Sequence, residues 1–432
     1  MNRRAAAPLA ETGTASPRDR SAAGQGQQRR AAALYVTYDG LLEPLGYSQV
    51  FRYVRGLASD YEITVVSYEK AADWADVRRR ATLAAAAERA GLRWVPLRYH
   101  QRPTVPATAF DLAAGLAVCA ALTIRHRIRL VHARSYVPAV IALALQRLTG
   151  ARFLFDMRGF WADERVESGI WPPDSRLYRG AKWFERQFLR HADAVVSLTN
   201  AGAHALAHSA AFPIRPARVA VIPTCTDLQA FVPRPQGEQA ESAGGRAFTL
   251  GYVGNAGLWY LFDVTLRCFA ALLEVRPDAR LVVLNRGQHD YIRQRVAALG
   301  LPPDRVTIKA VDPGAVPDEM RQMDAGAFFI RPTFAKLASA PTRLGEFLGC
   351  GVPCLANAGV GDVEQILESE GVGVALRSQE ADEIRAGVRR LVALAAAPDV
   401  ALRCRAAAEK HFDLDRGIAA YRQLYAELLG SG

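Results

Sequence analysis

Cysteine is scarce in this sequence, and its spacing would not hold a metal ion. Six cysteines are scattered over 432 residues. Only Cys350 and Cys354 lie near each other, and no further Cys or His completes a zinc-binding spacing. Asp413-Leu414-Asp415 has the form Asp-x-Asp, but it precedes the last helical pattern, so we expect Asp415 to cap that helix. We therefore expect no metal, and buried free thiols typical of a reducing compartment.

Two further classes of binding protein are disfavoured by missing motifs. No Gly-x-Gly-x-x-Gly follows an expected strand, and the stretch from Gly254 to Gly257 is too short for that dinucleotide fingerprint. We therefore expect no nicotinamide or flavin cofactor. The formal net charge is +11, but no Arg and Lys run is interleaved with aromatic residues, so we expect no nucleic acid as partner. The surplus favours an anionic donor or an anionic membrane surface.

Export and membrane-spanning signals are missing as well. Residues 1–30 mix Ala, Gly, Gln, Arg and Ser without an apolar h-region, so we predict a disordered tail rather than a secretory signal. The longest apolar segment, Leu112 to Ile124, has 13 residues, too few to span a bilayer. We interpret it as a core helix or a surface-docking helix. These features predict a cytoplasmic protein, with a peripheral contact at the inner face of the membrane.

Expected strands and helices alternate along most of the chain. Half of the residues are hydrophobic, and the length fits two domains better than one. The alternation predicts two doubly wound parallel sheets of the Rossmann-like α/β class that face each other across a cleft. Residues Pro233 to Arg246 interrupt the alternation of strands and helices because they have no apolar periodicity, which predicts a linker. The predicted divisions are a tail at 1–30, a first domain at 31–232, a linker at 233–247, a second domain at 248–410 and a final helix at 411–432.

The stretch 325–364 carries the strongest functional signal. It reads as strand, loop, helix, short strand, glycine turn and helix. A loop between the carboxyl end of a buried strand and a helix N-terminus presents free backbone N–H groups, which bind phosphate. We predict that this region holds a nucleotide diphosphate sugar, with Glu346 on a ribose diol. The alternative is an ordinary βαβ unit with surface charges. The predicted donor-binding residues are Glu346, Arg343, Thr342, Ser339, Lys336, Arg331, Gly361, Asp362 and Gly254.

A second charged motif follows an apolar strand in the first half. Residues 156–165 hold five charges in ten positions, which is difficult to explain as packing. Asp156 would accept the proton of a substrate hydroxyl, the acceptor, or orient that hydroxyl. Arg158 would stabilise developing negative charge. A structural ion-pair cluster is the alternative. The residues predicted to contact the acceptor are Phe160, Trp161, Asp163 and Glu164.

Two other loops follow strands of the first half. His132 and Arg134 end one strand and are further catalytic candidates, although a histidine there is also typical of a packed core. The loop from Asp39 to Gln49 contains Gly46, Ser48 and Gln49, which we expect near the donor phosphate. A plain helix-capping loop would explain the same residues.

The second-half stretch resembles the donor-site signature of the family 4 retaining glycosyltransferases, which have the GT-B fold. Glu346, Cys350, Gly351 and Pro353 match the second half of the family's Glu-x7-Glu pattern, whereas the first glutamate is replaced by Ala338. Residues 156–164 are similar to an Asp-x-Arg-Gly-Phe-Trp-x-Asp-Glu motif in one branch of that family. Arg343 stands where the branch has a lysine. The usual Arg and Lys after the first strand of the second domain are absent.

The resemblance implies sugar transfer from a nucleotide diphosphate sugar to an acceptor hydroxyl, without a metal and with retention of anomeric configuration. It also implies that the final helix crosses back onto the first domain. We expect a sugar or lipid-linked acceptor, in polysaccharide or glycolipid assembly. Two alternatives stay open, a GT-B sugar-nucleotide epimerase and a non-catalytic sugar-nucleotide-binding protein. The second alternative is consistent with the alanine at position 338, where the family has a glutamate.

Overall fold

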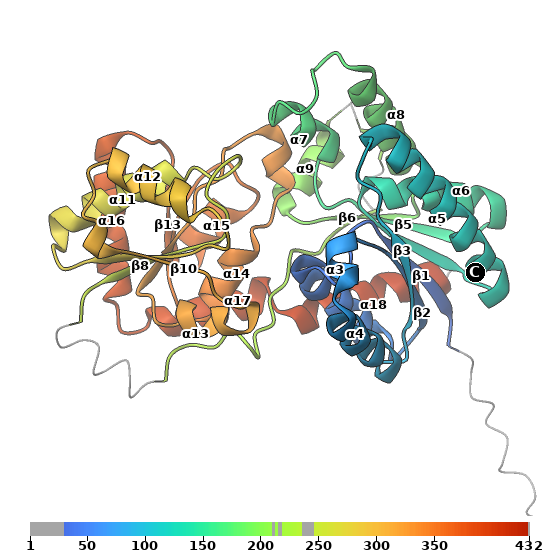
Figure 1. Ribbon diagram of the computed structural model, residues 1–432, viewed down its shortest axis with the longest axis horizontal. Coiled ribbons are helices and arrows are strands. Elements are labelled where there is room, and N and C mark those ends of the chain that lie inside the picture. Colours follow the sequence, from blue (N-terminus) through green and yellow to red (C-terminus); the bar gives the residue numbers. More distant parts are fainter. Residues whose placement is uncertain (1–29, 210–211, 215–217, 236–245, 431–432) are drawn as a thin grey trace, which may run out of the picture. The chain divides into compact units, whose positions relative to one another are not determined.

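A seven-stranded parallel sheet forms the first half of the fold (Figure 1). The strand order is β3-β2-β1-β4-β5-β6-β7, so the direction of winding reverses between β1 and β4. The computed structural model describes residues 30–209, 212–214, 218–235 and 246–430. The strands are β1 (Ala32–Thr37), β2 (Glu62–Glu69), β3 (Arg93–Arg98), β4 (Leu130–Arg134), β5 (Arg152–Asp156), β6 (Ala194–Ser197) and β7 (Val219–Val221).

Helices connect these strands, as the alternation predicts. They begin with α1 (Pro44–Gly46), which continues through a π-helical turn at Tyr47–Phe51 into α2 (Arg52–Leu57). The others are α3 (Ala71–Ala75), α4 (Val77–Arg89), α5 (Thr104–His126), α6 (Tyr136–Thr149), α7 (Trp161–Glu167), α8 (Arg176–His191) and α9 (Asn200–His208).

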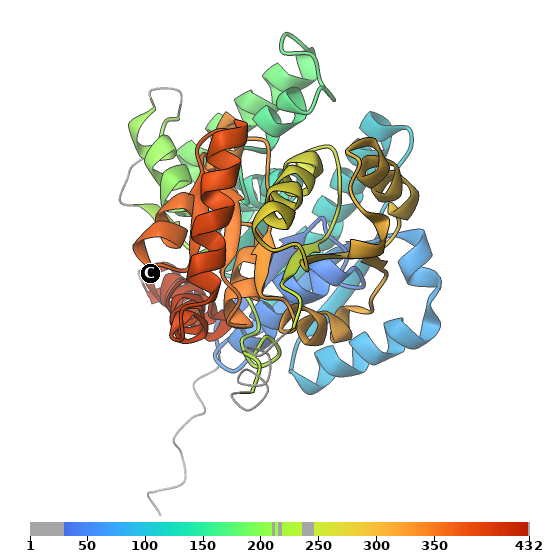
Figure 2. The same ribbon diagram turned by 90° about the vertical axis from the view of Figure 1, so that its left-hand side faces the viewer.

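The second half contains a six-stranded parallel sheet with the order β10-β9-β8-β11-β12-β13. Its strands are β8 (Thr249–Val253), β9 (Arg280–Leu284), β10 (Val306–Lys309), β11 (Ala325–Ala327), β12 (Cys354–Asn357) and β13 (Gly373–Leu376). Its helices are α11 (Phe262–Val275), α12 (His289–Ala298), α13 (Val316–Met320), α14 (Thr342–Gly349), α15 (Val363–Ser369), α16 (Ala381–Ala395) and α17 (Val400–His411). Three 3-10 turns join them at Pro303–Arg305, Pro313–Ala315 and Phe334–Ala338. Helices α11 and α16 lie side by side against this sheet (Figure 2).

Both sheets are buried on their two faces, which is why their strands are almost continuously apolar. Successive side chains of β1 enter different cores: Ala33 and Tyr35 enter one, Leu34 and Val36 the other. The second sheet likewise separates two cores. This arrangement confirms the predicted fold class, two Rossmann-like α/β halves.

The last helix, α18 (Leu414–Gly430), packs on the first half although it follows the second half in sequence. Its Ile418, Tyr421 and Tyr425 belong to the same core as Tyr35 of β1. In Figure 1 this helix (red) lies beside the blue strands of the first sheet. The final helix therefore crosses back as the resemblance implied.

Three sequence predictions need comment. The apolar segment predicted at Leu112 to Ile124 is part of the longer helix α5, which by length and composition alone would suffice to cross a bilayer, a property shared by core helices of soluble proteins. Strand β13 and helix α7 were not predicted. The tail, apart from Arg30, and most of the predicted linker lie outside the described residues, so the predicted domain divisions stay predictions.

Candidate active site

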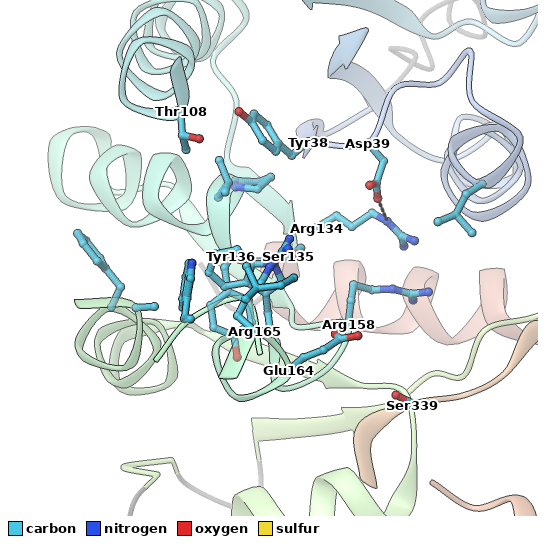
Figure 3. Close-up of a pocket in the computed structure, with 18 of the residues that line it drawn as sticks. Tyr38, Asp39, Thr108, Arg134, Ser135, Tyr136, Arg158, Glu164, Arg165 and Ser339 are labelled. Carbon is cyan, nitrogen blue, oxygen red and sulfur yellow. Dashed lines mark hydrogen bonds and ion pairs between the residues drawn. The ribbon is translucent and has the colours of Figure 1, made fainter. Parts of the chain in front are cut away.

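A cavity of about 1310 Å³ lies where the two sheets reverse their winding. Residues after the carboxyl ends of β1 and β4 line it, namely Tyr38, Asp39, Arg134 and Ser135. The second half contributes Tyr260 and the segment 339–343 just before and at the start of α14. Loops from both sheets thus converge on one space, as open α/β sheets do at their ligand sites (Figure 3).

Arg343 is the cation that the second half presents to this cavity. Its guanidinium lies 4.4 Å from the centre of the Tyr260 ring. It also lies over Gly254, which follows β8 with φ of +110°: a Cβ at residue 254 would meet Nη2 at 2.0 Å. Nη1 is buried and has no hydrogen-bond partner among the described residues. The guanidinium lines the cavity and has no carboxylate partner among the described residues, so an anion in the cavity would balance its charge.

Three other predicted donor residues lie around Arg343. Ser339 and Thr342 line the cavity, and Thr342 begins α14, where backbone N–H groups lack helical partners. Glu346 follows one helical turn later and is half-buried but does not line the cavity. Burial raises the pKa of its carboxyl, and nearby Arg343 opposes that effect.

The remaining donor candidates make protein contacts instead. Lys336 lines the cavity, but its ammonium lies 2.8 Å from Glu164 Oε1 and 4.0 Å from the centre of the Trp259 ring. Arg331 is exposed and outside the cavity. The Gly361 N–H donates to the Lys336 carbonyl. Asp362 accepts hydrogen bonds from the backbone N–H groups of residues 200 and 201, so it caps α9 of the first half.

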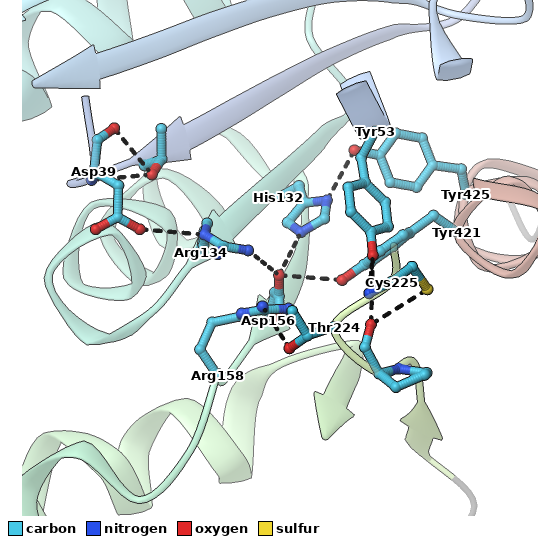
Figure 4. Close-up of polar contacts among 12 residues, drawn as sticks. Asp39, Tyr53, His132, Arg134, Asp156, Arg158, Thr224, Cys225, Tyr421 and Tyr425 are labelled. Carbon is cyan, nitrogen blue, oxygen red and sulfur yellow. Dashed lines mark hydrogen bonds and ion pairs between the residues drawn. The ribbon is translucent and has the colours of Figure 1, made fainter. Parts of the chain in front are cut away.

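A buried polar cluster underlies the first-half side of the cavity (Figure 4). Asp156 is fully buried at the carboxyl end of β5 and does not line the cavity. Its carboxylate lies 3.7 Å from Arg134 Nη1 and 3.8 Å from Arg158 Nη1, and it accepts a hydrogen bond from the Tyr421 hydroxyl at 3.1 Å. Both arginines do line the cavity. Asp156 thus positions two cations, and burial separates it from any acceptor.

The charge states of this cluster follow from its contacts. Burial disfavours the charged form of Asp156, but Arg158, His132 and Arg134 outweigh it and hold the pKa of Asp156 at about 2. Burial lowers the pKa of His132 despite its neighbour Asp156. His132 Nδ1 lies 2.9 Å from the Tyr425 hydroxyl. His132 is therefore a neutral, packed histidine, the alternative that the sequence left open.

Strained backbone occurs at two residues that line the cavity. Arg158 has φ of +60° and Ser135 has φ of +72°, and neither is glycine. Such conformations cost of the order of 1–3 kcal/mol each and cluster at functional sites. At residue 158 the strained backbone places a guanidinium in the cavity, where it also contacts Thr224.

The predicted acceptor residues are divided between the cavity and the core. Trp161 and Glu164 line the cavity. Phe160 is buried and stacked between Phe212 and Phe334. Asp163 accepts a hydrogen bond from the Tyr178 hydroxyl and forms an ion pair with the Lys182 ammonium. For Asp163, this is the structural ion-pair cluster that the sequence offered as the alternative to acceptor binding.

The predicted first-loop residues shape the loop and do not line the cavity. Gly46 lies so near Gly40 that a Cβ added to Gly46 would approach the Gly40 carbonyl oxygen to 1.9 Å. Gln49 is buried and donates to the Cys225 carbonyl, and Ser48 donates to the Leu45 carbonyl. Both residues lie inside the π-helical turn Tyr47–Phe51, and neither side chain caps a helix, so their contacts correspond to a structural role other than the predicted one.

Sequence reasoning missed two residues that build the site. Glu69 ends β2, is buried, and accepts from the N–H groups of Leu41 and Leu42. It thereby fixes the loop that carries Asp39, which accepts from Arg134 Nε at 3.3 Å. A charged residue directly after the apolar run of β2 was the available signal for Glu69. Asp39 had the equivalent signal after β1.

The two parallel α/β sheets and the returning last helix have the GT-B fold. Residues 48–225 match the family described as "Glycosyl transferase 4-like domain". A search of curated proteins finds no match.

Several solved structures share the fold across nearly the whole chain. Sucrose-phosphate synthase from Thermosynechococcus elongatus has a TM-score of 0.69 and 14% identity, covering 93% of this chain and 100% of that one. HepE from Anabaena, solved with UDP-glucose, has a TM-score of 0.63 and 16% identity over 93% and 100%. WaaG, a glycosyltransferase involved in lipopolysaccharide biosynthesis, has a TM-score of 0.64 and 15% identity over 91% and 99%. The GT-B fold is therefore shared at low sequence identity.

Proposed function

We propose that the protein transfers a sugar from a nucleotide diphosphate sugar to an acceptor hydroxyl, with retention of anomeric configuration. The observation that carries this proposal is the guanidinium of Arg343, which lines the cavity and forms no ion pair with a carboxylate among the described residues. It lines the same cavity as Arg134 and Arg158 of the other half. The glycosyltransferase 4-like match and the complex of HepE with UDP-glucose support this class of donor.

The donor diphosphate would lie at the start of α14. Backbone N–H groups of the first turn and the side chains of Ser339 and Thr342 would donate to phosphate oxygens, and Arg343 would neutralise the departing charge. Arg343 thus takes the place of the Arg and Lys that the family carries after the first strand of this domain. The sugar would extend from there toward the first half.

Arg134 and Arg158 would act on the developing negative charge from the opposite side. In the transfer, the bond from the anomeric carbon to the phosphate oxygen breaks, a bond to the acceptor oxygen forms, and the proton of the acceptor hydroxyl passes to an oxygen of the departing diphosphate. Asp156 orients both guanidinium groups from beneath the cavity. We therefore assign Asp156 a positioning role in place of the predicted direct contact with the acceptor.

The cellular setting is part of the same proposal. The net charge of +11 supports a peripheral position at the inner, anionic face of a membrane. The structural likeness to WaaG supports a role in polysaccharide or glycolipid assembly.

Calorimetric titration with UDP, GDP and ADP tests the donor site. We expect one of them to bind, and Arg343→Ala to weaken that binding roughly tenfold or more, because a charge-assisted contact is lost. Arg331→Ala is the matched control, since Arg331 is exposed nearby and lies outside the cavity. Equal losses in the two variants, or no binding at all, would contradict the proposal.

Product analysis separates the two alternatives. Incubation with the sugar nucleotide that binds and with candidate acceptors should yield a glycosylated product. Conversion of the donor to its epimer without transfer would instead identify an epimerase. Binding without any turnover would identify a sugar-nucleotide-binding protein.

A further inference from the structure

The cavity has an apolar end that the donor would not fill. Its side chains come from α5, α8 and the loop before α8, all in the first half, whereas Arg343 belongs to α14 of the second half. Val105 and Leu112 line it from α5, and Leu177 and Phe184 line it from α8. Ile170, from the loop before α8, completes the wall. A sugar and a diphosphate have no use for such a surface, because both are strongly hydrated.

The groove follows from how the helices pack. Helices α5 and α8 both pack on α6, and each of them turns large apolar side chains toward the cavity beside a few polar ones. Val105 is 55% exposed, Leu177 46% and Ile170 52%. These large side chains would leave water if a hydrocarbon chain lay among them, which is worth about 25 cal/mol per Å² of apolar surface removed from water.

Two arginines from the neighbouring elements also line the cavity. Arg165 of α7 lies with its guanidinium 5.2 Å from the centre of the Trp161 ring, and Arg176 begins α8. Both line the cavity, and neither forms an ion pair with another residue in the part of the chain that the structure describes. Thr108 of α5 also lines this end (Figure 3). An anionic group attached to a hydrocarbon chain would meet both kinds of surface.

We propose that this apolar end binds the hydrocarbon chain of a lipid-phosphate-linked acceptor, with its phosphate against Arg165 and Arg176. This inference rests on the proposed sugar transfer. The continuity of the groove with Arg134 and Arg158 would bring the acceptor's polar end to the donor sugar. The charge of the two arginines is complementary to a phosphate linker, and a neutral oligosaccharide would leave it unused.

Binding of two phosphate monoesters tests this inference on the full chain. Dodecyl phosphate, used below its micelle concentration, should bind, as measured by calorimetry, and ethyl phosphate should bind at least about a hundredfold more weakly, because it lacks the chain. The double variant Val105→Asn/Leu177→Asn should bind dodecyl phosphate roughly tenfold more weakly. Arg165→Gln/Arg176→Gln should weaken it by a similar factor.

The matched control is Ile124→Asn/Leu148→Asn. These residues lie on α5 and α6, are 72% and 71% exposed, and do not line the cavity. We expect this variant to bind dodecyl phosphate like the unmodified protein. Equal weakening by the control and the groove variant would show adsorption to the outer apolar surface, as a bilayer contact would, and would overturn the inference.

Nucleotide titrations keep the two proposals distinguishable. If UDP, GDP or ADP binds and dodecyl phosphate does not, the lipid groove is overturned and the donor site stands. If dodecyl phosphate binds and no nucleotide does, the proposed transfer fails, and the lipid's assignment as an acceptor fails with it.

Discussion

The Arg343 guanidinium lies over the Cα of Gly254, where a Cβ would approach Nη2 to 2.0 Å. This contact joins the end of β8 to the start of α14, two segments almost ninety residues apart. Glycine at 254 leaves room for the cation, and the Tyr260 ring supports the guanidinium at 4.4 Å. The position of the Arg343 guanidinium therefore depends on the absence of a side chain at residue 254.

Replacing Gly254 by alanine tests that dependence. The new methyl group would displace the Arg343 guanidinium, so we expect roughly tenfold weaker nucleotide binding by calorimetry. Gly257→Ala is the control, because Gly257 also has positive φ, +147°, but the nearest atom to a Cβ added there would lie 3.8 Å away. Backbone strain alone would affect both variants alike. Equal losses in nucleotide affinity would remove the steric explanation.

The pKa of Asp156 predicts a pH dependence of stability. Its folded pKa, about 2, lies below the unfolded value of 3.8. The ionised carboxylate therefore stabilises the fold above about pH 4, and this contribution disappears as the pH falls toward 2. The shift corresponds to about 2 kcal/mol. The free energies of unfolding of the unmodified protein and of Asp156→Asn, measured with denaturant, should differ by about 2 kcal/mol less at pH 2 than at pH 6. A difference that does not change with pH would contradict the assignment.

Tyr421 tests how α18 supports the cluster. Its hydroxyl donates to Asp156 Oδ2 at 3.1 Å in a fully buried setting. Tyr421→Phe should lower the free energy of unfolding by about 1–3 kcal/mol and reduce turnover, because a buried carboxylate oxygen loses its partner. Tyr425 lies on the same helix, and Tyr425→Phe removes the hydroxyl that contacts neutral His132. We expect this variant to lose less free energy of unfolding than Tyr421→Phe. The reverse order of losses would speak against an ionised Asp156.

Asp362 should behave as a helix cap and not as a donor ligand. Its carboxylate accepts from the N–H groups of Asn200 and Ala201 at 2.7 and 2.9 Å. Asp362→Ala should therefore lower the free energy of unfolding by about 1 kcal/mol. The nucleotide dissociation constant should stay unchanged. A tenfold rise in that constant would return Asp362 to the donor site.

The sequence allowed the fold class to be predicted because strands buried on both faces are apolar along their length. The same local reasoning singled out Arg343, which stands at a helix start after a strand, and the structure places it in the lining of the cavity. Strand β13, Gly373–Leu376, escaped notice because Gly371 and Gly373 interrupt its apolar run, and glycine is depleted in strands. Its apolar pattern is too short to separate from a helix segment.

The burial of Asp156 could not be predicted from its neighbours in sequence. The hydroxyl that it accepts from lies on Tyr421, 265 positions later. Lys336 was predicted as a phosphate ligand, but Glu164, 172 positions earlier, holds its ammonium. Local sequence patterns indicate where charged residues lie relative to strands and helices. Which of these residues pair with each other depends on contacts between segments far apart in the sequence.

The chain passes between the two sheets twice, and the passages pair with each other. The Thr226 N–H donates to the Phe412 carbonyl at 2.7 Å, and the Leu414 N–H donates to the Thr226 carbonyl at 3.2 Å. Any rotation that widens or narrows the cavity must twist both segments together at this two-stranded strap. The two passages are therefore tied to each other by main-chain hydrogen bonds, and neither can shift without disturbing the other.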